Sequence, residues 1–153
     1  MTDLAIAQLN VGRAFGLMDE PVMAGFANRL AEINALAESS PGFIWRLKDG
    51  AGNATSIHAF DDPRVILNLT MWASVEDLFE FTYRTVHVEL FRERRAWFEP
   101  YGKPHLVLWW QPASDPPTIE EAKRRLDLLT ESGPTPEAFT LKTRFAPELA
   151  PDR

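Results

Sequence analysis

Apolar and polar residues alternate along several segments of this chain in a way that predicts β-strands. The alternation is clearest in residues 65–72 (VILNLTMW), where successive side chains would point to opposite faces of a sheet. Residues 4–13, 42–47 and 105–111 are also rich in apolar residues and predict three more strands. Since both faces of 65–72 carry apolar side chains, we expect this strand to lie in the centre of the sheet.

Apolar residues at helical spacing predict three helices. Residues 19–21 (DEP) supply a cap, a first-turn acid and a first-turn proline for a helix that continues from residue 22 and ends near residues 39–42. Residues 74–97 begin with a Ser-x-x-Asp sequence that resembles a capping box, so a second helix is predicted there. A Thr-x-x-Glu start and a Gly-Pro stop frame a third helix at residues 119–131.

The predicted elements follow the order β, α, β, β, α, β, with one more helix at the end. Right-handed crossovers in such a chain give an α+β fold of the ferredoxin-like kind, with both helices on one face of a four-stranded antiparallel sheet. The opposite face would be bare and apolar, and a second copy packed across a two-fold axis would cover it. We therefore expect one domain over residues 1–153 that forms a homodimeric α/β barrel, with a largely irregular tail at 136–153.

Charge and composition narrow the range of partners. The chain has 16 Lys and Arg against 22 Asp and Glu, a net charge of −6, which disfavours nucleic acid as a partner. It has no cysteine, which excludes disulfides, thiolate nucleophiles and cysteine-bound metals. No stretch approaches the ~18 apolar residues of a membrane span, and no basic leader precedes an apolar run. We expect a cytoplasmic protein with no membrane partner.

Residues 68–110 (NLTMWASVEDLFEFTYRTVHVELFRERRAWFEPYGKPHLVLWW) resemble the core of a family known as domain of unknown function 3291. Residues 21–47, 117–129 and 133–139 resemble the same family. That family is similar to the antibiotic-biosynthesis monooxygenase group and to other dimeric α/β barrels. The resemblance implies the same fold as the pattern of elements, and it supplies no reaction.

Cofactor-independent monooxygenases of that group oxidise polycyclic phenols with molecular oxygen, and they use an Asn and a Trp four residues apart on a strand. Asn68 and Trp72 match this spacing. The two positions would share one face of the strand and lie ~13 Å apart, so only a large flat substrate or a reaching indole would touch both. The resemblance thus implies catalytic roles for Asn68, which would hold a phenolate or developing oxyanion, and for Trp72, which would position the ring system.

Tyr83 and His87 lie four residues apart on the second predicted helix and would project from one face of it. A histidine titrates near neutrality and would accept a proton from a phenol, to which the tyrosine would donate a hydrogen bond. The alternative is that His87 is a core histidine bonded to a backbone carbonyl. We carry His87 as a catalytic candidate and Tyr83 as a substrate-binding candidate.

Amide side chains gather at the centre of the predicted sheet. Asn10 and Gln8 share one face of the first strand, which would pair antiparallel with the strand that carries Asn68. These amides would therefore converge. Buried amides need partners, so they either hold the core together or bind a ligand, and Asn10 is a substrate-binding candidate on the second interpretation.

Arg46 and Trp110 complete the candidate substrate-binding set. Arg46 lies inside an apolar strand, where a charge must face solvent, an edge or a partner group, and a pocket role and an interface role both remain open. Trp109 and Trp110 would point to opposite faces of their strand, one toward the helices and the other toward the dimer partner.

We expect no metal and no other cofactor. The three histidines, His58, His87 and His105, have no metal-ligand spacing, and the chain has no GxGxxG sequence. Some dimeric α/β barrels bind haem through a helical histidine, which leaves His87 as an alternative haem ligand without a motif to support it.

Two functional hypotheses follow. The first is a protein that binds a small aromatic or polycyclic molecule, and acts on it as a cofactor-independent monooxygenase, in a pocket between sheet and helices lined by Asn10, Asn68, Trp72, Tyr83 and His87. The second is a non-catalytic dimeric binding or scaffold protein whose polar core residues serve structure alone.

Overall fold

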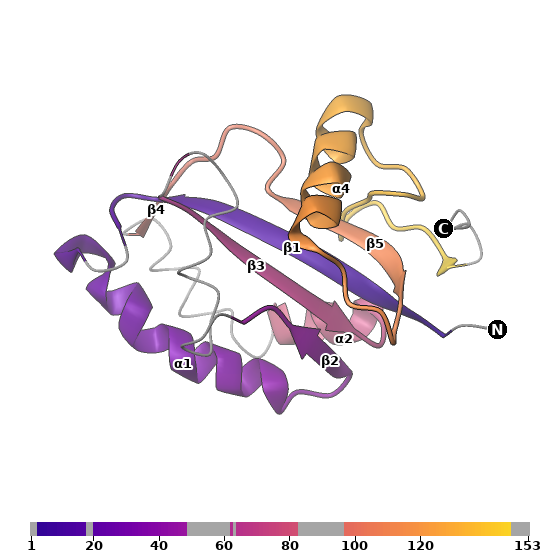
Figure 1. Cartoon of the computed structure of the whole chain (residues 1–153), viewed down its shortest axis with the longest axis horizontal. Helices are drawn as coiled ribbons and strands as arrows, with labels where there is room; N and C mark the ends of the chain where they lie inside the picture. The colour runs from indigo at the N-terminus through magenta and orange to yellow at the C-terminus, as the bar shows by residue number, and fades with distance from the viewer. Residues whose placement is uncertain (1–2, 18–19, 49–61, 63, 83–96, 148–153) are drawn as a thin grey trace.

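The computed structural model describes residues 3–17, 20–48, 62, 64–82 and 97–147. These residues form a mixed α+β fold in which helices pack on a five-stranded antiparallel sheet (Figure 1). The stretch between the strands predicted at residues 42–47 and 65–72 falls largely outside the described residues. No helix in the described ranges is long and apolar enough to cross a membrane.

Four longer strands and one very short strand make the sheet. They are β1 (Leu4–Ala14), β2 (Phe43–Arg46), β3 (Val65–Trp72), β4 (Phe98–Glu99) and β5 (Leu106–Pro112). β3 lies between β2 and β1, and β5 pairs with the other edge of β1. The central position of β3 is therefore confirmed, and the four predicted strands are present within a residue or two of their expected bounds.

The sequence pattern did not predict β4, which pairs only with Arg13 and Ala14 at the end of β1. Two residues are too few for an alternation to show. Charges hold this end of the sheet, because Arg13 donates to Asp62 at 3.2 Å and to Glu99 at 3.5 Å.

The helices begin at the predicted signals. Those within the described ranges are the 3-10 turn η1 (Pro21–Met23), α1 (Ala24–Glu38), α2 (Val75–Glu80) and α4 (Ile119–Ser132). Ser74 caps α2 by accepting a hydrogen bond from the Asp77 amide at 3.1 Å, and Thr118 caps α4 in the same way with Glu121. Gly133 follows α4 with φ of 72°, a conformation that favours glycine. The caps predicted at Ser74 and Thr118 and the stop predicted at Gly133 are confirmed. The cap predicted at residues 19–21 is not: Asp19 lies outside the described residues, and Glu20 precedes η1 without a side-chain cap hydrogen bond.

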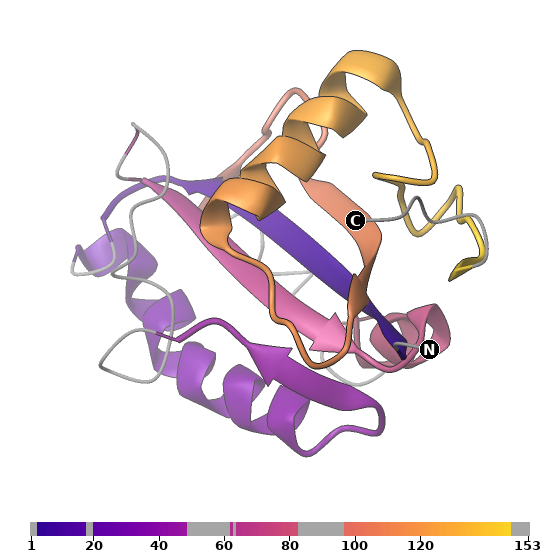
Figure 2. The ribbon, with the colours of Figure 1, turned by 45° about the vertical axis from the view of Figure 1, so that its right-hand side comes forward.

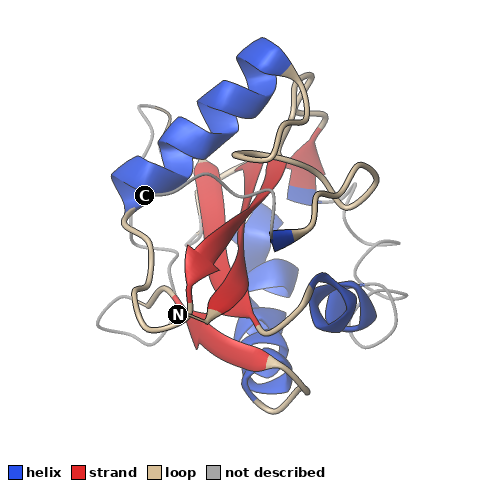
Figure 3. Ribbon diagram, turned by 90° about the vertical axis from the view of Figure 1, so that its right-hand side faces the viewer, coloured by secondary structure: helices blue, strands red, loops and turns tan. Residues whose placement is uncertain are grey.

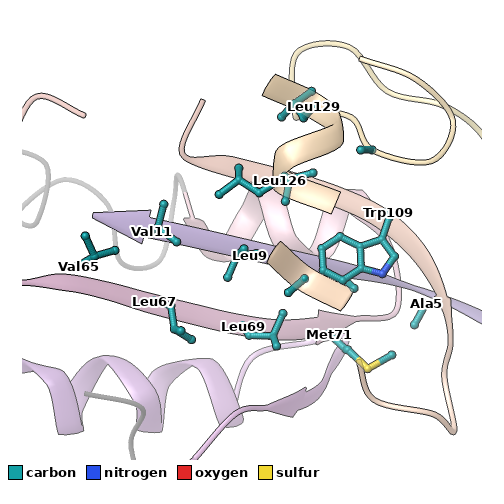
Figure 4. Close-up of a cluster of buried hydrophobic side chains, with 14 residues drawn as sticks. Ala5, Leu9, Val11, Val65, Leu67, Leu69, Met71, Trp109, Leu126 and Leu129 are labelled. Carbon is teal, nitrogen blue, oxygen red and sulfur yellow. The ribbon is translucent and has the colours of Figure 1, made fainter. Parts of the chain in front are cut away.

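The helices lie on both faces of the sheet, as Figure 2 shows. We call the side covered by α1 and α2 the α1 face, and the other side the α4 face. The expectation of a bare α4 face is wrong, because Leu126 and Leu129 of α4 pack there against Leu9, Leu69 and other strand residues that are buried within the single chain (Figure 4). The bare face was the physical reason to expect a dimer, and that reason is removed.

The packing of Trp109 also differs from the prediction. Its side chain points away from α1 and α2, the direction in which a dimer partner was expected, but it is fully buried in the cluster that α4 completes. Trp110 points to the α1 face beside Ile6, its neighbour across the strands.

The residues after α4 return along the open edge of β5 (Figure 3). Phe139 and Leu108 exchange two backbone hydrogen bonds of 2.8 Å, and the Phe139 ring is fully buried on the α1 face. Residues 134–147 have no helix of a full turn or longer strand in the structure, yet they carry the chain from the α4 face to the α1 face and fix it there.

Candidate functional site

A row of polar side chains crosses the α1 face in the middle of the sheet. In the β1–β3 register, Gln8 stands opposite Thr70 and Asn10 stands opposite Asn68. Opposite residues in an antiparallel pair point to the same face. The predicted convergence of the amides of β1 with Asn68 is therefore confirmed. We call these four residues the polar belt.

Two hydrogen bonds lie within the polar belt, and a third joins it to Trp72. The Gln8 Nε2 group donates to Asn68 Oδ1 at 2.7 Å and to Thr70 Oγ1 at 2.9 Å. The Trp72 Nε1 group donates to the same Thr70 hydroxyl at 2.9 Å. Asn68 and Trp72, which the resemblance paired across ~13 Å of strand, are thus connected through Gln8 and Thr70. Thr70 was missed in the sequence, although it lies on the same face as both residues.

Burial divides the polar belt into an inner and an outer part. Gln8 and Thr70 are each 4% exposed, and Trp72 is fully buried. Asn10 and Asn68 are exposed. Among the described residues, the Asn10 side chain has no hydrogen-bond partner and Asn68 uses only its Oδ1 atom. The Asn68 NH2 group and the whole Asn10 amide are thus available to another molecule.

Aromatic clusters lie on either side of the polar belt along the strands. At one end, Trp72 lies between Phe43, with ring centroids 5.5 Å apart, and Phe81, at 4.9 Å. At the other end, Phe26 makes edge contacts with Trp97 at 5.5 Å and with Phe98 at 5.1 Å. The polar belt therefore separates two apolar clusters in the layer between the sheet and its helices.

Arg46 lies next to the polar belt on β2, where it stands opposite Thr70. It is 9% exposed, its Nη2 atom lies 3.6 Å from Glu38 Oε1, and its Nε atom is buried without a hydrogen-bond partner. Lys48 contacts the same carboxylate at 3.3 Å. The hydrogen bond from Lys48, aided by the charge of Arg46, holds the pKa of Glu38 below its usual value.

Sequence reasoning also missed Asn34, a polar residue of α1 that is 9% exposed. It lies one turn before Ala37, which is buried in the cluster around Trp72, so it shares the side of α1 that faces the sheet. The signal was present, since Asn34 interrupts the apolar positions of the helix.

The remaining predicted site residues are not brought to the polar belt by the described structure. Trp110 is partly exposed and donates its indole N–H to the Phe145 carbonyl at 2.8 Å, so that donor is used. Tyr83 and His87 lie outside the described residues, as does His58. Within the described ranges, no group of three His, Asp or Glu side chains could hold a metal ion.

Comparison with known proteins places the chain. A family model for a domain of unknown function, DUF3291, matches residues 5–153. The chain belongs to the DUF3291 family. No curated protein and no solved structure matches it. The family that residues 68–110 indicated is therefore confirmed, and the function of this DUF3291 protein has to be argued from its own geometry.

We expect the inner residues of the polar belt to contribute more to the unfolding free energy than the outer residues do. Replacing Gln8 with leucine removes both hydrogen bonds and leaves the buried Thr70 hydroxyl with one partner fewer, so we expect a loss of about 1–3 kcal/mol in unfolding free energy. Asn10→Ala is the matched control on the same strand, and it should change stability by less than about 0.5 kcal/mol because Asn10 is exposed. Urea denaturation measures both. Equal losses would mean that the exposed amide also holds the core.

Proposed function

We propose that this DUF3291 protein binds a small aromatic molecule with oxygen substituents across the polar belt. One observation carries the proposal: Asn10 and Asn68 face each other at the centre of a sheet face and are exposed, and no described residue satisfies the Asn68 NH2 group or the Asn10 amide. Exposed amides between two apolar clusters offer hydrogen bonds to a small molecule that enters from solvent, and this combination suits a ligand.

The chemistry of the polar belt favours this class of molecule. The Asn68 NH2 group donates hydrogen bonds, and the Asn10 amide both donates and accepts. Such groups suit a hydroxyl, a phenolate or a quinone oxygen. The Phe and Trp rings on either side suit an aromatic ring, which prefers edge or offset contacts with other rings. Gln8 would help by holding the Asn68 carbonyl oxygen and so fixing the direction of its NH2 group.

We also propose a ferredoxin-like fold and, beyond binding, a monooxygenase-like reaction. The order β2, β3, β1, β5 of the longer strands supports a ferredoxin-like arrangement with β4 as an addition. In a monooxygenase-like reaction, Asn68 would hold the phenolate oxygen of the substrate. Trp72 would act only through Thr70, because its ring is fully buried and its N–H is already donated.

Self-association is also a proposal. A homodimer through the α4 face would have to include α4 in the interface, because Leu69 and Trp109 are already buried beneath it.

Thermal melts with a panel of phenols and quinones test binding. At a ligand concentration about 100 times its Kd, the protein should gain about 2.7 kcal/mol of stability, which raises Tm by several degrees. Asn68→Ala should lose most of that gain, and without ligand it should lose at most about 1–2 kcal/mol, because it also removes the acceptor of one hydrogen bond from the buried Gln8 amide. Glu131→Ala, an exposed position on α4, is the control and should keep the gain.

Two results would contradict the proposal. One is a panel in which no compound stabilises the wild-type protein. The other is an Asn68→Ala variant that, in the absence of any compound, loses more stability than its one hydrogen bond with Gln8 explains. Either result favours the alternative, in which the polar belt holds the sheet together and binds nothing.

A further inference from the structure

We infer that the molecule bound at the polar belt carries an acidic group, and that Arg46 supplies the opposite charge. This inference rests on the proposed function and narrows it to aromatic acids, such as hydroxylated benzoates or naphthoates. The evidence is the state of Arg46: a buried cation, beside free amides, whose own hydrogen-bonding capacity is unmet.

Arg46 is a buried cation with an unmet hydrogen-bond donor. Its guanidinium is always charged and has several N–H donors, and a buried charge is costly unless it is paired and hydrogen-bonded. The residue is 9% exposed, and its Nε atom is buried without a partner. Its one ion pair in the described structure, with Glu38 at 3.6 Å, is longer than a hydrogen bond. The guanidinium therefore has donors to offer to a further oxygen.

The charges around Arg46 are not balanced by the described carboxylates. Glu38 is shared between Arg46 and Lys48, so two cations meet one carboxylate, and that carboxylate is itself 39% exposed at the side chain. The four residues of the polar belt are uncharged. Counted over the described residues, Arg46, Lys48 and Glu38 therefore leave one positive charge unbalanced beside the polar belt, in a protein whose net charge is −6.

The register of the sheet places Arg46 near Asn68. Arg46 stands opposite Thr70, and Asn68 lies two residues from Thr70 on the same face. Diagonal neighbours of this kind have Cβ atoms roughly 7–8 Å apart, within reach of a long side chain. An aromatic acid whose hydroxyl oxygen accepts a hydrogen bond from the Asn68 NH2 group would place its carboxylate within reach of Arg46. Arginine and carboxylate match in geometry, so the pair would be strong.

Matched acids and methyl esters test this inference. Calorimetric titration of the wild-type protein with a panel of hydroxybenzoates and hydroxynaphthoates, and with their methyl esters, should give a Kd at least about 10-fold lower for an acid than for its ester. Arg46→Gln should reduce that ratio to about 1, chiefly by weakening the binding of the acids. Arg124→Gln removes the same charge from an exposed position on α4 and should keep the ratio.

A second variant serves if Arg46→Gln fails to fold. Glu38→Gln removes the carboxylate that partly neutralises Arg46, so it should lower the Kd of the acids by about 3-fold and leave the esters unaffected. Acids and esters that bind the wild-type protein equally, or a preference for acids that persists in Arg46→Gln or does not respond to Glu38→Gln, would overturn the inference and leave the proposed function intact. If neither acids nor esters bind, the inference fails together with the proposed function.

Discussion

Replacing Gly42 with alanine is expected to cost at least about 3 kcal/mol of unfolding free energy, the sum of backbone strain and a steric clash. Gly42 connects α1 to β2 with φ of 82°, a region that side-chain-bearing residues rarely adopt. A Cβ atom there would lie 2.6 Å from the Asp77 Cβ atom and closer still to its carboxylate. The Gly42 carbonyl also accepts a hydrogen bond from Ala73 at 2.7 Å, so the turn cannot shift without loss.

Thermal unfolding measures this effect, and a fall in Tm of roughly 6–12 °C is expected for a chain of this size. Gly102→Ala is the matched control, because Gly102 has φ of 78° but no atom within 4 Å of the added Cβ. It should cost only about 1 kcal/mol, from the backbone alone. Equal losses in the two variants would show that contact with Asp77 plays no part.

Arg125→Met is expected to cost about 3 kcal/mol, because it removes a partly buried ion pair together with the donor to the Glu137 carbonyl. Arg125 is 6% exposed, pairs with Glu121 at 2.8 Å and donates to the Glu137 carbonyl at 2.7 Å. Its guanidinium lies 5.7 Å from the Trp109 ring centroid. The residue therefore ties α4 both to the sheet and to the segment that follows. Arg124→Met, at an exposed position with the same carboxylate, should cost at most about 1 kcal/mol.

The cost of Arg125→Met depends on pH. The hydrogen bond from Arg124, together with the charge of Arg125, lowers the pKa of Glu121 from 4.5 to about 2 against the opposing effect of burial. A depressed carboxyl pKa adds stability that is fully present above the unfolded value and is lost as the pH falls toward the folded value. The difference in stability between wild type and variant should therefore shrink between pH 4.5 and about pH 2. Denaturation series at several pH values check this, and a difference that stayed constant would exclude the ion pair as its source.

The strands and helix caps could be predicted because they depend on local sequence. The alternation in residues 65–72 gives β3 its bounds, and the Ser74 and Thr118 caps are formed by neighbours three residues away. The side of the sheet on which α4 packs could not be predicted, because an amphipathic helix fits either apolar face. The bare face, and with it the case for a dimer interface there, depended on that choice.

The candidate site could be predicted in part. Convergence of Gln8 and Asn68 follows once β1 is paired with β3, and the structure confirms it. The complete burial of Trp72 and the unmet donor of Arg46 depend on rings and carboxylates that come from other elements, so no local pattern reveals them. Asn34 differs from these two, because its place among the apolar positions of α1 was a signal in the sequence.

Side-chain amide groups give a direct view of the polar belt by nuclear magnetic resonance, because each Asn and Gln NH2 group has its own signals. The signals of Asn10 and Asn68, assigned from Asn10→Ala and Asn68→Ala, should shift progressively as an aromatic ligand from the melting panel is added. The Gln111 signals are the internal control, because this amide is buried on the α4 face and bonded to Trp109 and Asp115. Shifts at Asn10 and Asn68 with Gln111 unchanged are the result that our account predicts, whereas a ligand that binds and leaves both asparagine signals in place would contradict it.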